Sequence, residues 1–280
     1  MKCQVCGNSA RVFRNDFEFP PRYCSFKFNI CCGCEHIKLL PPLSDSDSGQ
    51  QYLRAHIFAV DAIPAKIRRR AQRVVDSLGK ANSRIIYDIG AGNCSYAMAF
   101  TKLGYTGVAI DVERFNPNYP FFVKVDEFSN YLAEYGAAGF FSNHSFEHIE
   151  LTELTSLLRL LKSKMTGGVV GYFVMPAAKL GLVRAGVYLE EFCYGHKNLF
   201  SKDSALIYFK EEFPESQGYL VSVSAFQFRA GFLLTRLQIL TRLIFRGHLY
   251  RAVRLCDYLF ANLWRGSPEE LVVEVKKVEA

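Results

Sequence analysis

Residues 85–100 constrain the fold of this chain more than any other stretch. The apolar, β-branched run at 85–89 leads into two glycines one residue apart, and the residues after Ser95 read as the first turns of a helix. In such a strand–turn–helix unit, Gly90 supplies the tight turn, Gly92 lets the backbone approach a ligand, and Ser95 is small enough for close helix packing. The stretch therefore predicts an α/β fold on an open sheet, with a ligand site at the turn.

Two acidic residues indicate which ligand the turn would favour. Asp111 ends a second strand-like run, nineteen residues after Gly92, where a carboxylate can accept hydrogen bonds from a ribose diol. Asp88 stands two residues before Gly90, where it would repel the pyrophosphate of a dinucleotide but attract an ammonium group. The pair favours S-adenosylmethionine, which carries an amine and a cationic sulfonium. A dehydrogenase with a nicotinamide cofactor is the alternative.

The segment from Asp88 to Gly92, followed by Asp111, resembles motif I and the acidic loop of class I S-adenosylmethionine-dependent methyltransferases. Residues 140–149 resemble the fourth strand and the Glu-His-Ile segment of that superfamily, and residues 157–170 resemble its next helix, Gly-Gly turn and fifth strand. The resemblance implies a Rossmann-like seven-stranded methyltransferase sheet. The residues expected to contact the cofactor are Asp88, Gly90, Gly92, Asp111, Asp126, Asn143 and His144.

Asp126 follows a short strand-like run at residues 121–125. In the superfamily that the chain resembles, a residue near this strand end contacts the adenine amino group, so Asp126 is the candidate. The alternative is an N-cap for the helix that begins near Phe128.

Two histidines are the candidates for the acceptor side. His148 lies where the fourth strand should end, at the edge at which open α/β sheets bind ligands. A hydroxyl acceptor benefits from a base with a pKa near 7, which is the range of histidine, and Glu147 could orient the ring. A helix cap is the alternative for His148. His196 begins a His-x-x-x-Phe-Ser pattern that resembles the substrate-side segment of sugar and small-molecule methyltransferases, with a structural role as its alternative.

Six of the nine cysteines fall within the first 34 residues. They include two Cys-x-x-Cys pairs separated by 24 residues, a spacing that fits a closed, tetrahedral, structural zinc site. Redox catalysis by one pair is the weaker alternative, because neither pair starts a helix after a strand. Cys24 or Cys32 could replace one ligand. The expected metal ligands are Cys3, Cys6, Cys31 and Cys34.

This N-terminal segment resembles the zinc-binding segment of sugar methyltransferases related to nucleotide-sugar C-methyltransferases. Two departures are visible: Glu35 replaces the usual glycine after the second pair, and the chain is too short for the large C-terminal domain of the C-methylating enzymes. The resemblance therefore implies O- or N-methylation of a sugar, a polysaccharide precursor or another small molecule.

The pattern divides the chain into a zinc-ribbon-like module at 1–45, a polar linker at 46–54 and a methyltransferase domain at 55–280. Residues 219–228 and 271–278 alternate as strands, and we expect them to pair antiparallel. Residues 231–265 would then be a helical insertion rich in arginine. It could lie on an anionic membrane surface, but apolar positions surround both helical runs, which favours packing on the sheet or on a second subunit of a homodimer.

Charge and hydropathy limit the partners and the location. The formal net charge of +7 permits an anionic partner without requiring one. The basic cluster at 66–73 is expected to be a solvated helix face, because no aromatic residues stand between its arginines as nucleic-acid stacking would require. We find no signal-peptide-like run and no apolar stretch of about 18 residues, so a cytoplasmic protein is expected, with membrane association through 231–265 as the alternative. An RNA methyltransferase and a non-catalytic, cofactor-binding scaffold are the rival functions.

Overall fold

The structure is a computed structural model that describes residues 2–19, 22–40, 63–79, 83–178, 196–226 and 270–278. The linker at 46–54 and the insertion at 231–265 lie outside the described residues. So does most of the loop before His196.

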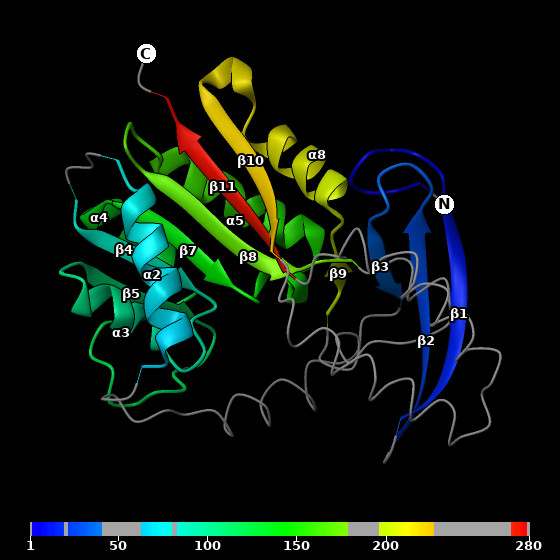
Figure 1. The fold of residues 1–280 in the computed structure, drawn as a ribbon, viewed down its shortest axis with the longest axis horizontal. Coiled ribbons are helices and arrows are strands. Elements are labelled where there is room, and N and C mark those ends of the chain that lie inside the picture. The colour runs from blue at the N-terminus through cyan, green and yellow to red at the C-terminus, as the bar shows by residue number, and fades with distance from the viewer. Residues whose placement is uncertain are drawn as a thin grey trace.

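A seven-stranded sheet forms the centre of the chain (Figure 1), in the order β10-β11-β8-β7-β4-β5-β6. Strands β4 to β8 run parallel, and β11 is antiparallel to both of its neighbours. The predicted antiparallel pair and the predicted Rossmann-like sheet are confirmed. The strands are β4 Ile85–Ile89, β5 Thr106–Asp111, β6 Phe122–Lys124, β7 Gly139–Asn143, β8 Val170–Pro176, β10 Tyr219–Phe226 and β11 Glu270–Lys277.

Helices cover both faces of this sheet, which explains why its central strands read as continuous apolar runs. Ile86 faces α2 and α3, whereas the adjacent Tyr87 faces α4, α5 and α8. Helix α2 begins directly after Pro64, and the side chain of Ser201 caps α8 by accepting a hydrogen bond from the Ser204 amide at 3.0 Å. The helices are α2 Ala65–Ser77, α3 Ser95–Lys102, α4 Phe128–Tyr135, α5 Leu151–Lys164 and α8 Lys202–Glu212, with 3-10 turns η1 Phe146–His148 and η2 Glu215–Gln217.

The N-terminal module, residues 2–40, is built around a second, antiparallel sheet in the order β1-β2-β3-β9 (Figure 1). Its fourth strand, β9, comes from the main domain, from the segment between β8 and α8. The module also shares one apolar core with α5 and α8, to which Val5 contributes. The module is therefore joined to the main domain by strand pairing and by side-chain packing. The strands are β1 Ala10–Phe19, β2 Arg22–Cys31, β3 Ile37–Leu40 and β9 Asn198–Leu199.

The carboxyl ends of the parallel strands meet at one edge of the central sheet, where ligands bind in open α/β folds. Because β11 runs the opposite way, its first residue lies at the same edge, and Glu270 pairs with Pro176 at the end of β8. This edge therefore brings together the glycine turn after β4, Asp111 at the end of β5, and the segment after β7.

Gly107 on β5 allows the close packing of α3 that the sequence assigned to Ser95. A Cβ atom on Gly107 would lie 2.0 Å from the carbonyl oxygen of Ala97, which is a backbone atom and cannot rotate away. Ser95 is itself buried, as expected for a small residue at this position. The missing side chain of Gly107 is therefore what lets the helix lie directly on the strand.

We expect Gly107→Ala to lower the free energy of unfolding by about 3 kcal/mol, since the added methyl group must push α3 off β5. The matched control is Gly104→Ala. Gly104 has φ +86° and no atom within 4 Å of the added Cβ, so only the left-handed backbone should cost stability, by about 1 kcal/mol. Urea denaturation of both variants measures the difference, and equal losses would contradict the packing argument.

Candidate functional site

The glycine turn between β4 and α3 lies directly against the segment that follows β7. Gly90 and Gly92 adopt φ values of 70° and 51°, in the left-handed region that favours glycine. The amide of Gly90 donates to the carbonyl of Ile110 at 2.8 Å, which ties the turn to β5. A Cβ atom on Gly90 would lie 1.8 Å from the hydroxyl oxygen of Ser145. The absence of a side chain at Gly90 is thus what allows the two segments to meet.

Asp88 lies beneath the turn, with only 2% of its surface exposed. Its Oδ2 atom accepts a hydrogen bond at 3.1 Å from the amide of Ala97, in the first turn of α3. Burial raises the pKa of Asp88 to about 7, the Ala97 amide lowers it, and the charge of Asp111 raises it further. In this structure Asp88 provides a hydrogen-bond acceptor for a backbone amide in the first turn of α3, which has no partner within the helix. Its predicted attraction for an ammonium group stays a prediction.

Asp111 lies at the rim of the same turn and is only partly buried. Its Oδ2 accepts a hydrogen bond from the amide of Gly92 at 2.8 Å, and its Oδ1 accepts one from the amide of Val112 at 2.7 Å. Burial raises the pKa of Asp111, while these amides lower it. The two amides fix the carboxylate next to Gly92, at the position predicted to meet a ribose.

Asp126 is exposed, after the end of β6. Its alternative role as a helix N-cap is wrong, because Glu127 occupies the cap position of α4 and makes no side-chain cap hydrogen bond. The amide of the preceding Val125 donates to the carbonyl of Asp111 at 3.1 Å. Asp126 therefore follows directly after a residue that contacts Asp111. The contact with adenine stays a prediction.

Arg70 and Glu270 form a buried charge pair that sequence reasoning missed. Arg70 was assigned to a solvated helix face, but only 11% of its side chain is exposed, and it forms an ion pair with Glu270 from β11. The expectation of a fully solvated basic face is therefore wrong at this residue. One signal existed: Arg70 lies three residues after Ile67 and four before Val74, on the apolar side of α2.

The Arg70–Glu270 pair holds the two cofactor-side candidates at the end of β7. The Oδ1 atom of Asn143 accepts a hydrogen bond from Arg70 at 2.5 Å, and His144 Nε2 lies 3.0 Å from Glu270 Oε1. Burial opposes charge on both groups, but neighbouring charges outweigh it: Glu147 and Glu270 raise the pKa of His144 to about 9, and His144 and Arg70 lower that of Glu270 to about 2. Asn143 and His144 are thus held from the side of β11.

The histidine–carboxylate cluster consists of Glu147, His148 and His196, and the structure brings both predicted histidines together. Their ring centroids are 4.6 Å apart, and His196 Nε2 lies 3.8 Å from Glu147 Oε1. The amide of Lys197 donates to the carbonyl of Glu147 at 2.7 Å, which anchors the two chain segments to each other. The helix-cap alternative for His148 is wrong, because Glu150 occupies the N-cap position of α5.

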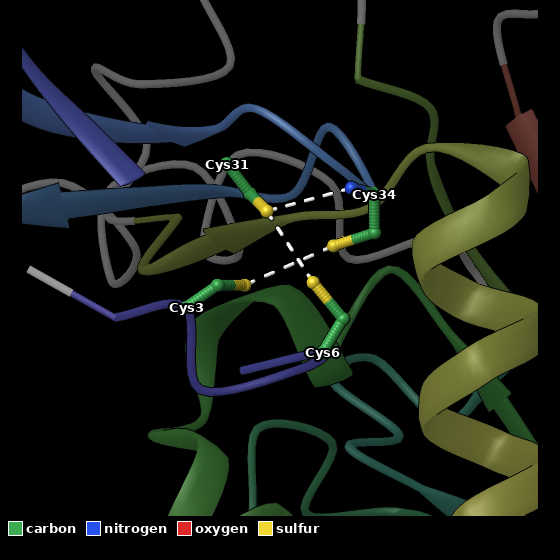
Figure 2. Close-up of side chains that lie close together, drawn as sticks. All are labelled: Cys3, Cys6, Cys31 and Cys34. Carbon is green, nitrogen blue, oxygen red and sulfur yellow. Dashed lines mark hydrogen bonds between the residues drawn. The ribbon is translucent and has the colours of Figure 1, made fainter. Parts of the chain in front are cut away.

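The four-cysteine cluster consists of Cys3, Cys6, Cys31 and Cys34, whose sulfur atoms converge between the two Cys-x-x-Cys pairs (Figure 2). The sulfur atoms of Cys3 and Cys34 are 3.8 Å apart and those of Cys6 and Cys31 are 3.4 Å apart, which is too long for a disulfide. The amides of Gly33 and Cys34 point at the Cys31 sulfur at 3.3 and 3.4 Å. These four residues are the ones the spacing predicted.

Cys32 is not part of the four-cysteine cluster, and the backbone of Cys24 is far along its strand from it. Cys32 is exposed, and Cys24 is on β2 opposite Phe17, seven residues along the strand from Cys31, which is about 23 Å in extended chain. Glu35 stands where the zinc-binding segment that this module resembles usually has glycine, and its φ is 60°. The left-handed backbone at this position explains the preference for glycine there.

Comparison with protein-family models and with curated proteins gave no match. Among solved structures, an S-adenosylmethionine-dependent methyltransferase from Archaeoglobus fulgidus is similar with a TM-score of 0.53 at 15% identity, covering 81% of this chain and 99% of that protein. The plantazolicin methyltransferase BpumL, solved with S-adenosylhomocysteine, is similar with a TM-score of 0.52 at 15% identity, covering 84% of this chain and 92% of that one. The chain therefore has the Rossmann-like fold of class I methyltransferases.

Within the part of the chain that the structure describes, no helix combines the length and the apolar character needed to cross a bilayer.

We expect Asp88→Asn to flatten the pH dependence of stability. The folded pKa of about 7 lies above the ordinary 3.8, so the free energy of unfolding of the unmodified protein should fall as the pH rises from about 4 to 7. Asparagine cannot ionise and still offers an oxygen to the Ala97 amide. At pH 8 the variant should be more stable by roughly 2–4 kcal/mol.

Urea denaturation of the unliganded protein at several pH values measures this effect. The exposed Asp76 on α2 supplies the control, because Asp76→Asn should keep the profile of the unmodified protein. If the free energy of unfolding of Asp88→Asn falls with pH as steeply as that of the unmodified protein, the buried carboxyl group does not cause the pH dependence.

Proposed function

We propose that the protein is an S-adenosylmethionine-dependent methyltransferase that methylates a hydroxyl or amine of a small molecule, most simply a sugar or polysaccharide precursor. The observation that carries the proposal is the contact between Gly90 and Ser145. It places the glycine turn and the histidine–carboxylate cluster side by side at the ligand-binding edge of the sheet. A methyltransferase requires donor and acceptor sites in this relation, because methyl transfer depends on alignment of the two reactants.

The donor side fits S-adenosylmethionine better than a dinucleotide. The Asp111 carboxylate at the rim of the turn would oppose a pyrophosphate, and the buried Asp88 already accepts the Ala97 amide at the N-terminus of α3. The amide of Gly92 holds Asp111, whose carboxylate would accept hydrogen bonds from the ribose. When bound, S-adenosylmethionine supplies a methyl group activated by a positively charged sulfur. The remaining contacts are assigned to Gly90, Asp126, Asn143 and His144.

The acceptor side is assigned to His148 and His196. His148 is partly exposed, so an acceptor can reach its ring, whereas His196 is only 6% exposed and packs against it. A histidine at this place can hydrogen-bond an acceptor hydroxyl and take up its proton. The neighbouring Glu147 carboxylate would orient the rings. The chemical identity of the acceptor rests on the resemblance to sugar methyltransferases.

We also propose that the four-cysteine cluster holds a structural zinc ion. A tetrahedron with Zn–S distances of about 2.3 Å has edges of about 3.8 Å, and the sulfur separations of 3.8 and 3.4 Å are close to this length. Four thiolates fill the coordination sphere, so the ion has no position for a substrate. Its function would be to fold the module, which in turn supplies β3 as the partner strand of β9.

The zinc proposal thereby connects to the acceptor side. Ile37 and Lys38 of β3 pair with Leu199 and Asn198 of β9, which begins two residues after His196. The hydroxyl of Ser201 donates to the carbonyl of the ligand Cys34 at 2.7 Å. Loss of the ion should therefore loosen the segment that positions His196.

We expect isothermal titration of the zinc-loaded protein to show micromolar binding of S-adenosylmethionine and S-adenosylhomocysteine and none of NAD. Asp111→Ala should weaken binding at least tenfold, since it removes the acceptor that the ribose needs. Glu153→Ala, at an exposed carboxylate on α5, is the matched control and should bind normally. A folded protein that binds neither adenosyl compound would refute the methyltransferase proposal.

Cys34→Ser should abolish binding of one zinc ion per chain, measured by elemental analysis, and lower the thermal midpoint by several degrees. Amide hydrogen exchange at residues 196–200 should become faster, because β9 loses an ordered partner strand. Cys32→Ser, at the exposed neighbour, should retain both the zinc and the protection. Retention of a full zinc equivalent in Cys34→Ser would assign the ion to other ligands.

A further inference from the structure

The histidine–carboxylate cluster contains a buried anion that its surroundings satisfy incompletely. Glu147 is 1% exposed, and among the described residues neither of its carboxylate oxygens receives a hydrogen bond. The nearest ring nitrogens are His144 Nδ1 at 3.4 Å and His196 Nε2 at 3.8 Å from Oε1. Burying a carboxylate without hydrogen bonds is costly unless a cation is close.

Two imidazole rings, those of His148 and His196, lie close to this carboxylate. One ligand atom from each of Glu147, His148 and His196 can be chosen so that all lie within 4.8 Å of one another. The three come from two separate chain segments, η1 and the residues before β9, which the hydrogen bond from the Lys197 amide holds together. Small side-chain rotations would bring the three atoms onto one ion.

We propose that Glu147, His148 and His196 form a second metal site, distinct from the four-cysteine cluster, that binds a divalent transition-metal cation. Two imidazoles and one carboxylate suit Mn²⁺, Fe²⁺, Co²⁺ or Zn²⁺ better than Mg²⁺ or Ca²⁺, which prefer oxygen ligands alone. Three protein ligands leave coordination positions open, and the partial exposure of His148 gives access to them.

The open positions suggest what the ion does, and this step rests on the proposed function. They would bind a hydroxyl oxygen of the acceptor beside the glycine turn, since Ser145 packs on Gly90 two residues before Glu147. An ion lowers the pKa of a bound hydroxyl, so its proton would pass to solvent; the oxygen would then bond to the methyl carbon as the carbon–sulfur bond breaks, which leaves S-adenosylhomocysteine. His148 and His196 would then act by holding the ion, and an acceptor with oxygen ligands, such as a sugar, would be favoured over an amine.

The test titrates Co²⁺ into protein that already carries one zinc ion per chain. We expect one cobalt equivalent with weak visible absorption and without thiolate charge-transfer bands, because the site contains no sulfur. Glu147→Gln and His148→Ala should each weaken cobalt binding at least tenfold while retaining the zinc equivalent. Glu153→Gln, at an exposed carboxylate on α5, is the control and should bind cobalt normally.

Three outcomes would overturn the proposed site: no cobalt binding, cobalt binding unchanged in both variants, or absorption dominated by thiolate charge transfer, which would place cobalt at the cysteines. If the substitution of the buried Glu147 impairs folding, cobalt binding by the His148→Ala variant, at a partly exposed residue, is the test. A separate titration with S-adenosylhomocysteine keeps the two proposals apart. Cobalt binding without nucleoside binding would refute only the proposed function, and the reverse would refute only the metal site.

Discussion

The short segment after β7 organises the functional edge of this protein, because its backbone is fixed from two sides. Ser145 packs on Gly90, where no side chain larger than hydrogen fits, and the carbonyl of Glu147 accepts the amide of Lys197 at 2.7 Å. The first contact sets the distance to the glycine turn, and the second brings in the segment that carries His196. A ligand at the turn and a ligand at the histidines would therefore be neighbours whatever their identity.

The N-terminal module is part of this arrangement although it lies far away in the sequence. β9 is two residues long and gains its hydrogen bonds from β3 of the module, where the amide of Leu39 also donates to the carbonyl of Lys197 at 3.0 Å. Two residues of strand are too few to be stable alone. The order of the His196 segment is thus coupled to the folding of the four-cysteine cluster, which has little core of its own and would depend on a metal.

Buried carboxylates recur at the same edge, and each is compensated differently. Asp88 accepts a hydrogen bond from a helix amide, and its raised pKa lets it take up a proton and lose its charge, whereas Glu270 is paired with Arg70 and His144. Glu147 lies 3.4 Å from His144, whose pKa is raised, and 3.8 Å from His196, but neither of its oxygens receives a hydrogen bond from the described residues. A buried charge persists only where a cation or hydrogen-bond donors offset its desolvation, so the least satisfied of the three marks the place where a cation fits best.

Local sequence patterns determined the strand–turn–helix unit and the two pairs of clustered cysteines, because each of these depends on spacing within a short stretch. The sequence placed His148 and His196 on the same side of the site but did not predict that they touch. The tertiary structure showed that contact. Arg70 and Glu270 are 200 residues apart, and β9 is too short to show a periodicity. Such pairings follow from how the sheet edge brings distant segments together, so they were decided by the tertiary structure alone.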